Sequence, residues 1–337
     1  MVSSAANSTG SQPSKTHNVN YGFGGRLTEE FPSQVIVDLT EICNLKCTHC
    51  PHEDFTSSDH YNSRQLDPKL NKKLVDEVNM HGAKTTQYIR YTSNGEPLLH
   101  PSSHEMIDYA VRNSGVFVTL TTNGTILNEK RVAKLLESGL HLIDISIDAY
   151  LEDTYSKIRV NGNLQTTRSN VLRLIDMVKQ ARSKTKVVVS FIEQPENIDE
   201  ISSFQSYWQD NGADQVIIRR LHSAGGAVDQ LAGIMRNRQA AQKRKPCLYP
   251  WERILLSASG NLAFCPSDWS NSSHIMDYRN ITIRELWSGK FYKELRNAHL
   301  CNDYRDFEYC RNCPDWEQTR WPEEGRSYAN MIEDIIK

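Results

Sequence analysis

The fold is decided by the fourteen residues from Asp38 to Pro51, which read DLTEICNLKCTHCP. Within this stretch, Cys43, Cys47 and Cys50 have the spacing C-x3-C-x2-C and directly follow an apolar run at residues 35–37. Thiolates this close in sequence can bind one cluster of soft metal ions. An iron–sulfur cube normally takes four cysteines, so three would leave one iron open to another ligand. A structural zinc knuckle is the alternative, although zinc sites usually close four positions with paired C-x2-C knuckles.

Apolar, β-branched runs alternate with segments of helical period from residue 34 to residue 219. The predicted strands are 34–39, 87–91, 116–121, 142–147, 187–192 and 215–219. The predicted helices are 68–80, 104–112, 129–138, 170–181 and 198–211. Six strands separated by helices indicate parallel βαβ units with right-handed crossovers. We therefore predict an α/β fold, an incomplete (β/α)6 TIM-like barrel, with functional residues at the carboxyl ends of the strands.

Composition divides the chain into five parts. We predict a disordered tail over 1–30, the barrel over 31–226, a connector over 227–246, a second cysteine-bearing region over 247–320, and a polar tail over 321–337 that could end in a short helix. The connector ends in a basic run, which we expect to be a solvated charged face.

Bulk properties exclude several function classes. The 337 residues carry a formal net charge of −2, so no basic surface for nucleic acid is expected. No apolar stretch approaches the ~18 residues that span a bilayer, so no membrane partner is expected. The eight cysteines are clustered, which favours metal binding in a reducing compartment. We therefore expect a cytoplasmic protein.

The loop after the second predicted strand extends the cysteine signal into a family resemblance. The C-x3-C-x2-C spacing resembles that of the radical S-adenosylmethionine (SAM) enzymes, whose cluster binds SAM at the open iron. Asn94, Gly95, Glu96 and Pro97 resemble the Gly-Gly-Glu-Pro loop of that family, with Asn in place of the first Gly. The resemblance implies that this loop receives the methionyl amine of SAM. Taken alone, such a tetrapeptide indicates only a turn.

Further residues at strand ends match the family in the same order. The resemblance implies that His49 lies near the adenine, that Arg159 pairs with the SAM carboxylate and that Glu193 reaches the ribose. It also places Asn123, Ser146 and Asp148 around the SAM pocket. Simpler interpretations stay open: a turn at Asn123, a helix N-cap at Asp148 and an exposed arginine at Arg159.

The second cysteine region resembles the auxiliary-cluster domain called SPASM, or its short form, twitch. The pattern consists of Cys247, Gly260, Cys265, Cys310 and Cys313. The resemblance implies that the four thiolates hold one auxiliary 4Fe-4S cluster with no open iron, although two cysteine pairs could also bind zinc. Cys301 is left over. It is an inert thiol, a further ligand or a hydrogen-atom donor.

The resemblance implies an oxidoreductase that uses the two 4Fe-4S clusters and SAM. A 5′-deoxyadenosyl radical would remove hydrogen from a sugar- or cyclitol-like substrate, with the auxiliary cluster as electron acceptor and flavodoxin or ferredoxin as external donor. The short segments Pro250-Trp251 and Glu285-Leu286-Trp287 are similar to segments of those members that act on cyclitols and carbohydrates. The alternatives are an epimerase with Cys301 as hydrogen donor, a maturase of peptide or protein side chains, and a zinc-binding module without enzymatic activity.

Overall fold

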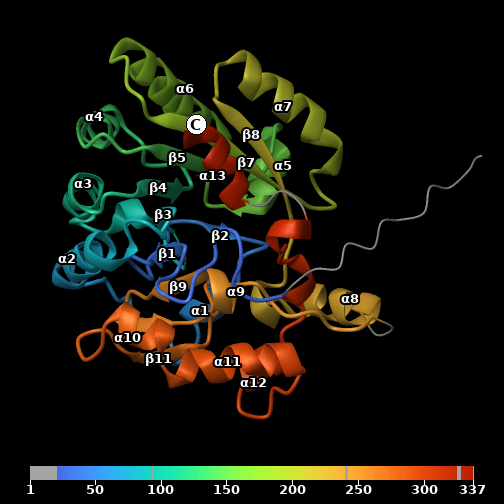
Figure 1. The fold of residues 1–337 in the computed structure, drawn as a ribbon. Helices are drawn as coiled ribbons and strands as arrows, with labels where there is room; N and C mark the ends of the chain where they lie inside the picture. The colour runs from blue at the N-terminus through green and yellow to red at the C-terminus, as the bar shows by residue number, and fades with distance from the viewer. Residues whose placement is uncertain (1–20, 93, 240–241, 325–327, 337) are drawn as a thin grey trace, which may run out of the picture.

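The structure is a computed structural model that describes residues 21–92, 94–239, 242–324 and 328–336. Its main sheet has the strand order β11-β10-β9-β1-β3-β4-β5-β7-β8 (Figure 1). Six neighbouring strands are parallel: β1 (Gln34–Val37), β3 (Tyr88–Tyr91), β4 (Phe117–Thr122), β5 (Leu142–Ser146), β7 (Lys186–Glu193) and β8 (Gln215–Arg220). These are the six predicted strands, and the incomplete parallel barrel is confirmed.

Helices between these strands cover the outer face of the sheet (Figure 1). They are α2 (Pro68–Glu77), continued by a π-helical turn at Val78–Gly82, α3 (Ser103–Asn113), α4 (Glu129–Glu137), α6 (Leu164–Gln180) and α7 (Ile201–Asp210). The helix predicted over 170–181 begins earlier, at Leu164, because the Asn163 side chain accepts a hydrogen bond from Thr166 N at 2.8 Å. Such an N-cap satisfies a backbone donor that would otherwise lack a partner. None of the described helices is long and apolar enough to cross a membrane.

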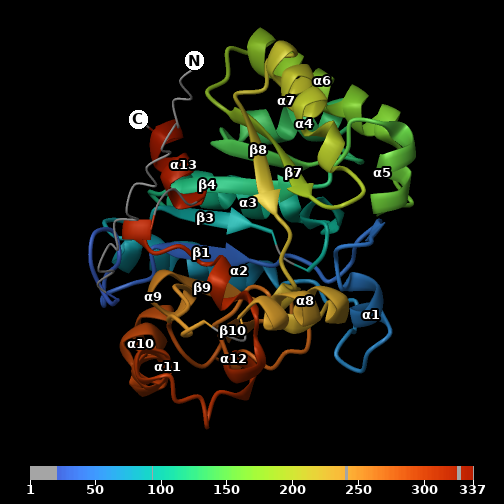
Figure 2. The same cartoon turned by 90° about the vertical axis from the view of Figure 1, so that its right-hand side faces the viewer.

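Successive residues of the strands point to opposite faces of the sheet. Ile89 and Tyr91 of β3 pack into the large core under the helices, whereas Tyr88 belongs to a second apolar cluster on the inner face. Met331 and Ile332 of α13 (Tyr328–Ile336) belong to the same inner cluster. Figure 2 shows α13 beside the ends at which β3 and β4 begin. The predicted short helix therefore exists, and it closes the inner face of the barrel at the amino ends of the strands.

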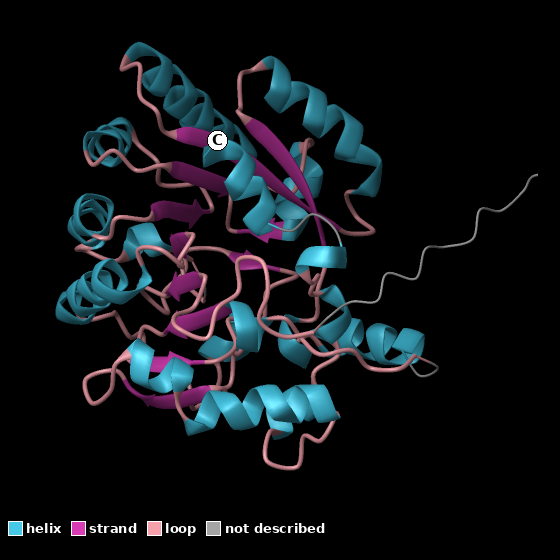
Figure 3. Cartoon of the chain, in the orientation of Figure 1, coloured by secondary structure: helices cyan, strands magenta, loops and turns pink. Residues whose placement is uncertain are grey.

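The C-terminal region adds strands to the barrel sheet. β9 (Arg253–Leu256) pairs with β1 in parallel, and β10 (Asn261–Ala263) and β11 (His274–Asp277) follow in antiparallel order. The region also contains helices α9 (Tyr249–Glu252), α10 (Ile283–Ser288), α11 (Lys290–Cys301) and α12 (Glu308–Asn312) (Figure 3). The sequence analysis gave no strands here. The domain boundaries given there stay predictions.

The predicted N-terminal tail is only partly covered by the described residues. Its residues 1–20 lie outside the described residues, but residues 21–30 pack against the C-terminal region. Leu27 is buried in one cluster with Leu248, Trp251 and Trp321. The disorder expected for residues 21–30 does not describe this part, because Tyr21 and Phe23 pack against the same cluster as Leu27.

The connector contains α8 (Asp229–Gln239), and its basic run is only partly solvated. Lys243 is exposed, as expected. Lys245 instead forms an ion pair with Glu324 at 2.8 Å, and Arg244 donates to the Cys310 carbonyl oxygen at 2.6 Å. The expectation of a solvated face was wrong for these two residues because both find acceptors in segments far along the chain.

Candidate metal and SAM site

The first cysteine set lies in the loop that follows β1, at the carboxyl end of the barrel strands. β2 (Lys46–Cys47) pairs antiparallel with β6 (Arg159–Val160), so that Cys47 is opposite Arg159. Burial raises the pKa of Cys43 to about 11 and that of Cys50 to about 12, and a charge on Cys47 would add to both shifts. The three thiols are therefore close enough to interact electrostatically. Metal binding would remove this penalty because thiolates are stable as metal ligands.

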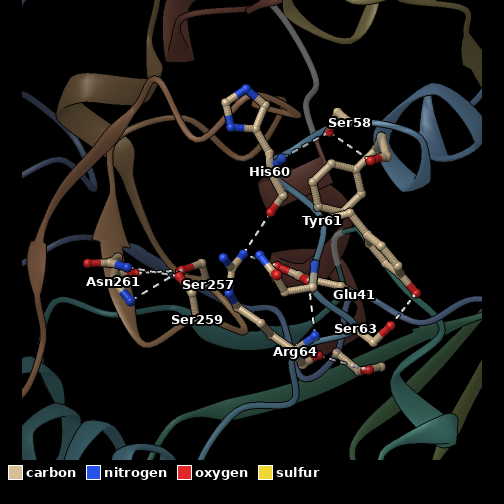
Figure 4. Close-up of polar contacts among 12 residues, drawn as sticks. Glu41, Ser58, His60, Tyr61, Ser63, Arg64, Ser257, Ser259 and Asn261 are labelled. Carbon is tan, nitrogen blue, oxygen red and sulfur yellow. Dashed lines mark hydrogen bonds and ion pairs between the residues drawn. The ribbon is translucent and has the colours of Figure 1, made fainter.

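Glu41, two residues before Cys43, fixes the shape of this loop (Figure 4). Its buried carboxylate accepts hydrogen bonds from Asn62 N at 3.0 Å, Arg64 N at 2.9 Å and Arg64 Nη1 at 2.8 Å. It thereby ties the segment after α1 (His52–Thr56) back to the cysteine loop. The sequence analysis assigned Glu41 no role. A charged residue between apolar Leu39 and Ile42 was the available signal, because a buried charge needs partners.

The Asn94–Pro97 loop packs directly on the cysteine loop. A Cβ built on Gly95 would lie 2.1 Å from the Thr40 carbonyl oxygen and 2.6 Å from that of Ile42. Glu96 N donates to the Ile42 carbonyl oxygen at 2.9 Å. Glycine is therefore required here for contact between two loops.

Glu96 is buried, and it joins this loop to the end of β4. Its carboxylate accepts from Thr122 Oγ1 at 2.7 Å, from Asn123 N at 2.8 Å and from Leu98 N at 3.2 Å. Burial raises the pKa of Glu96. Because Oε2 accepts only one of these bonds, it retains capacity for a donor such as an ammonium group. The Asn123 side chain also donates to Asn44 Oδ1 at 2.9 Å, which connects β4 to the cysteine loop.

Asp148 and Arg159 form a buried ion pair beside Cys47. Asp148 follows β5 with a φ of 65°, and its Oδ2 accepts from both Nε and Nη2 of Arg159. Its Oδ1 accepts from Ile192 N at 2.7 Å. The remaining terminal nitrogen of Arg159, Nη1, lies 3.6 Å from Cys47 Sγ. The two simpler interpretations that the sequence left open do not describe this geometry. Asp148 is more than a helix N-cap, because it pairs with Arg159, and Arg159 is buried rather than exposed.

His49 completes this group of polar residues. Its Nε2 lies 3.6 Å from Asp148 Oδ2, and its Nδ1 lies 3.3 Å from Gln194 Nε2. Burial lowers the pKa of His49 to about 4, so the ring is neutral at pH 7. Glu193 is exposed, whereas Gln194, which the sequence analysis did not assign, is buried. Ser146 is half-buried at the end of β5.

The second cysteine set surrounds a single cavity. Cys247, Cys265, Cys310 and Cys313 all line it. They come from the segment before α9, the segment after β10, α12 and the residue after α12. Burial, followed by the negative charges of Asp315 and Cys247, raises the pKa of Cys313 to about 12. The structure thus brings the four predicted ligands together.

His299 provides a test of whether this cavity fits a cluster. Its Nδ1 lies 3.3 Å from Cys247 N and 3.2 Å from the Tyr304 hydroxyl, so Nδ1 is the acceptor and Nε2 carries the proton. This Nε2 is buried without a hydrogen-bond partner among the described residues, and the ring lines the cavity. An unsatisfied buried donor is costly, and a cluster sulfur would satisfy it. The cavity therefore fits an iron–sulfur cluster.

The distances between the candidate metal-ligating side chains also bear on whether the site fits a cluster. In the described parts of the chain, no group of three or more His, Cys, Asp or Glu side chains is close enough to share one metal ion. The ligands of a 4Fe-4S cluster need not be that close, because each thiolate binds a different iron.

Asp315 connects the auxiliary site to the barrel. It accepts from Ser223 N at 2.9 Å and from Gly225 N at 2.7 Å, in the loop that follows β8. Gly225 has a φ of 71°, and a Cβ there would lie 2.0 Å from the Tyr309 hydroxyl. The residue two positions after Cys313 is therefore anchored at the carboxyl end of the last barrel strand.

Cys301 lies away from both cysteine sites. It is exposed at the end of α11, and its Sγ lies 3.6 Å from Asn297 Oδ1. It does not line the cavity of the other four C-terminal cysteines. The structure thus gives it no contact with a predicted site residue.

Family models match both parts of the chain. The model of the radical SAM superfamily matches residues 37–204, and the model of the SPASM iron-sulfur cluster-binding domain matches residues 247–314. Among curated relatives, GTP 3′,8-cyclase of Chlorobaculum tepidum is 30% identical over 53% of this chain and 51% of its own length. The mycofactocin maturase MftC of Mycolicibacterium smegmatis is 26% identical over 67% of this chain and 54% of its own length. The chain thus spans about half the length of these relatives.

Solved structures share the fold. BtrN in complex with AdoMet and 2-DOIA superposes with a TM-score of 0.59 at 18% identity, over 85% of this chain and 94% of that chain. Native anSMEcpe with bound AdoMet superposes with a TM-score of 0.57 at 13% identity, over 90% of this chain and 95% of that chain. At these identities the likeness concerns the fold alone.

Proposed function

Because the chain belongs to the radical SAM superfamily and carries a SPASM-type iron–sulfur region, we propose that it oxidises a secondary alcohol on a sugar- or cyclitol-like substrate. Its cofactors are SAM, a SAM-binding 4Fe-4S cluster and an auxiliary 4Fe-4S cluster. When bound, SAM and its reduced cluster supply a 5′-deoxyadenosyl radical, which takes a hydrogen atom from a substrate carbon.

Residues of the cysteine loop and of the neighbouring strand ends would hold the first cluster and SAM. Cys43, Cys47 and Cys50 bind the cluster, and the Asn94–Pro97 loop, already docked on this loop, lies beside it. Asp148 fixes Arg159 so that Nη1 lies beside Cys47, and Arg159 would pair with the SAM carboxylate. The buried, neutral His49 excludes water and a second charge from this region.

The observation that carries the proposal is the cavity shared by the four C-terminal cysteines and His299. With four thiolates, a cluster there has no open iron for a substrate. Such a site suits electron transfer. A cluster held there would supply the one-electron acceptor that conversion of an alcohol to a carbonyl group needs once the hydrogen atom has been removed, and the hydroxyl proton would go to solvent. The hydrogen bonds of Asp315 to the loop after β8 keep this acceptor next to the barrel.

A maturase that acts on peptide side chains is the second candidate. It is favoured by the match to mycofactocin maturase MftC over 67% of this chain. An epimerase that uses Cys301 is less favoured, because a hydrogen donor has to lie at the substrate and Cys301 is exposed away from both cysteine sites.

The test is anaerobic turnover of the reconstituted enzyme with a panel of sugars, cyclitols and peptides, in deuterated water, for the native chain and for Cys301→Ala. We expect one panel alcohol to become a ketone, with one 5′-deoxyadenosine per product, no solvent deuterium on carbon and no effect of the substitution. A modified peptide would favour the maturase. An inverted carbon that carries deuterium, lost in Cys301→Ala, would contradict dehydrogenation and favour the epimerase.

A further inference from the structure

The loop after β8 has a strained backbone that is held in place by hydrogen bonds. Three consecutive residues, Ala224, Gly225 and Gly226, have positive φ values of 53°, 71° and 104°. Glycine tolerates such values, but the Cβ of an alanine disfavours them. Asp315 stabilises this conformation, because it accepts from Ser223 N at 2.9 Å, from Ser223 Oγ at 2.8 Å and from Gly225 N at 2.7 Å. Backbone strain of this kind is typical of loops that present a functional side chain.

His222 is the side chain that this loop presents. Its Nδ1 accepts a hydrogen bond from Ala224 N at 3.1 Å and lies 3.9 Å from Asp315 Oδ2. Because Nδ1 is the acceptor of an amide, the proton of the neutral ring is on Nε2. This Nε2 makes no hydrogen bond with any residue that the structure describes. The ring therefore offers one N–H donor in a fixed direction.

The surroundings of His222 indicate that it faces the interior of the protein and not its outer surface. Its side chain is 52% exposed. Even so, burial lowers its pKa, and this effect exceeds the opposing effect of the negative charge of Asp315. A side chain that is accessible and yet surrounded by protein atoms lines an internal space. The lowered pKa also keeps the ring neutral at pH 7.

His222 lies between the two cysteine sites. On one side it is close enough to His49, the neighbour of Cys50, for its charge to lower the pKa of His49. On the other side it lies next to Asp315, two residues after Cys313. Its loop leads from the last barrel strand, β8, to α8 beside the C-terminal region (Figure 2). A molecule held between the SAM site and the auxiliary cavity would therefore meet the Nε2–H group.

We propose that His222 binds the substrate and that its Nε2–H group donates a hydrogen bond to a hydroxyl oxygen of a sugar- or cyclitol-like molecule. This inference rests on the proposed function, because it takes the space between the two cysteine sites as the substrate site. A carbonyl oxygen formed from that hydroxyl group accepts the same bond. His222 does not take the hydroxyl proton, because Nε2 already carries a proton and Nδ1 is bonded to Ala224 N.

A structural role in the loop alone does not account for a histidine at this position. The bond to Ala224 N needs only an acceptor two residues earlier, which an asparagine or aspartate side chain supplies in the same way. The bonds from the loop backbone to Asp315 do not involve the imidazole ring. What the histidine adds is the donor at Nε2, on the side of the ring away from the bond to the loop.

The test compares two substitutions that separate the bond to the loop from the donor. His222→Asn keeps an acceptor for Ala224 N and removes the donor at Nε2, whereas His222→Gln places an amide N–H group near the position of Nε2. Binding of myo-inositol, glucose and N-acetylglucosamine to the anaerobic holoenzyme with SAM is measured by isothermal titration calorimetry. For at least one probe, the affinity should fall about 3- to 10-fold in His222→Asn, since one hydrogen bond is lost, and His222→Gln should restore most of it. His60→Asn is the matched control, because His60 is exposed and only its backbone atoms form hydrogen bonds among the described residues.

A measurement on the native chain keeps the inference testable if a variant fails to fold. In a crystal structure of the native holoenzyme with SAM and the probe that binds most tightly, an oxygen of the probe should lie about 3 Å from His222 Nε2. A probe that is bound without this contact would overturn the inference. Unchanged affinity in His222→Asn, an equal loss in both variants, or no binding of any probe to the native holoenzyme would also overturn it.

The outcomes also separate this inference from the proposed function. Oxidation of an alcohol that is unaffected by His222→Asn would keep the function and refute the role of His222. Probe binding that depends on His222, without oxidation of any alcohol, would keep the site and refute the function.

Discussion

The two cysteine sites are built in different ways. Cys43, Cys47 and Cys50 come from one loop, whereas the four C-terminal ligands come from separate segments that meet only in the folded chain. Both sites contain an arginine, which is buried at Arg159 and half-buried at Arg244. Arg159 is neutralised by Asp148. Arg244 lines the second cavity, donates to the carbonyl oxygens of Cys310 and Arg311, and stacks on Tyr304 at 4.3 Å.

This difference bears on which site receives electrons. No carboxylate forms a salt bridge with Arg244 in the part of the chain that the structure describes. Its positive charge lowers the pKa of Cys310, although burial raises that pKa overall. A positive charge beside a cluster stabilises the reduced form, which has one more negative charge, whereas the negative charge of Asp315, which lines the same cavity, opposes this effect. We therefore expect the charge of Arg244 to raise the reduction potential of the auxiliary site and so to favour its role as electron acceptor.

The largest effect should come from removal of the first cysteine set. The triple variant Cys43→Ala, Cys47→Ala, Cys50→Ala should lose SAM cleavage completely, because no protein ligand of the SAM-binding cluster remains. Iron and sulfide analysis should find about four irons per chain in the second site. Continued formation of 5′-deoxyadenosine would refute the assignment.

Removal of the second set should separate SAM cleavage from turnover. With Cys247, Cys265, Cys310 and Cys313 all replaced by Ala, we expect SAM binding to persist and product formation to stop, because the electron acceptor is gone. The measurement is the ratio of product to 5′-deoxyadenosine. Cys301→Ala is the matched control and should keep both clusters. Normal turnover in the four-fold variant would show that the second site is not the acceptor.

The ion pair at the first site should have an intermediate effect. Asp148→Asn keeps the size of the side chain but removes the charge that orients Arg159, so SAM cleavage should fall about 10- to 100-fold. The control is Asp153→Asn, since Asp153 is exposed on α5 (Glu152–Ile158). SAM affinity and the rate of 5′-deoxyadenosine formation are measured separately. No change in either would limit the ion pair to a structural role.

The smallest effect should come from Arg244. Arg244→Gln should shift the reduction potential of the auxiliary cluster to a more negative value by tens of millivolts and leave the first cluster unchanged. The potentials are measured by redox titration followed by electron paramagnetic resonance. Lys243→Gln removes the exposed neighbouring charge and should have little effect, because solvent screens it. Equal shifts in both variants would mean that the position of the charge does not matter.

Local patterns were sufficient to predict most of the fold and both cysteine sets. Strand runs, helical periods and short cysteine spacings depend on neighbouring residues, so the sequence alone shows them. The strands β9, β10 and β11 were missed because they are short and because they join the sheet only through the pairing of β9 with β1, a contact between residues far apart in the chain. The burial of Leu27 was missed for a similar reason, since the buried residues that pack on it, Leu248, Trp251 and Trp321, lie near the other end of the chain.

The partners of the site residues could not be predicted in this way. The sequence indicated Asp148 and Arg159 as separate candidates, but it showed neither their ion pair nor the pairing of β6 with β2 that sets Arg159 opposite Cys47. His299 and Arg244 had no motif around them, and only the folded chain places them beside the cysteines. Glu41 lies within the cysteine motif. Because the cysteines accounted for the motif, no separate role was predicted for Glu41.

The position of the helix α13 affects when the barrel can close during synthesis of the chain. Met331 and Ile332 cover the inner face of strands such as β1 and β3, which are synthesised long before them. Contacts between residues this far apart in sequence form late in folding. While a nascent chain is still being made, the barrel is therefore open at its amino end, and its interior stays accessible to water until residues 328–336 have left the ribosome. We expect the cavity that would select the substrate to acquire its final shape only at that stage.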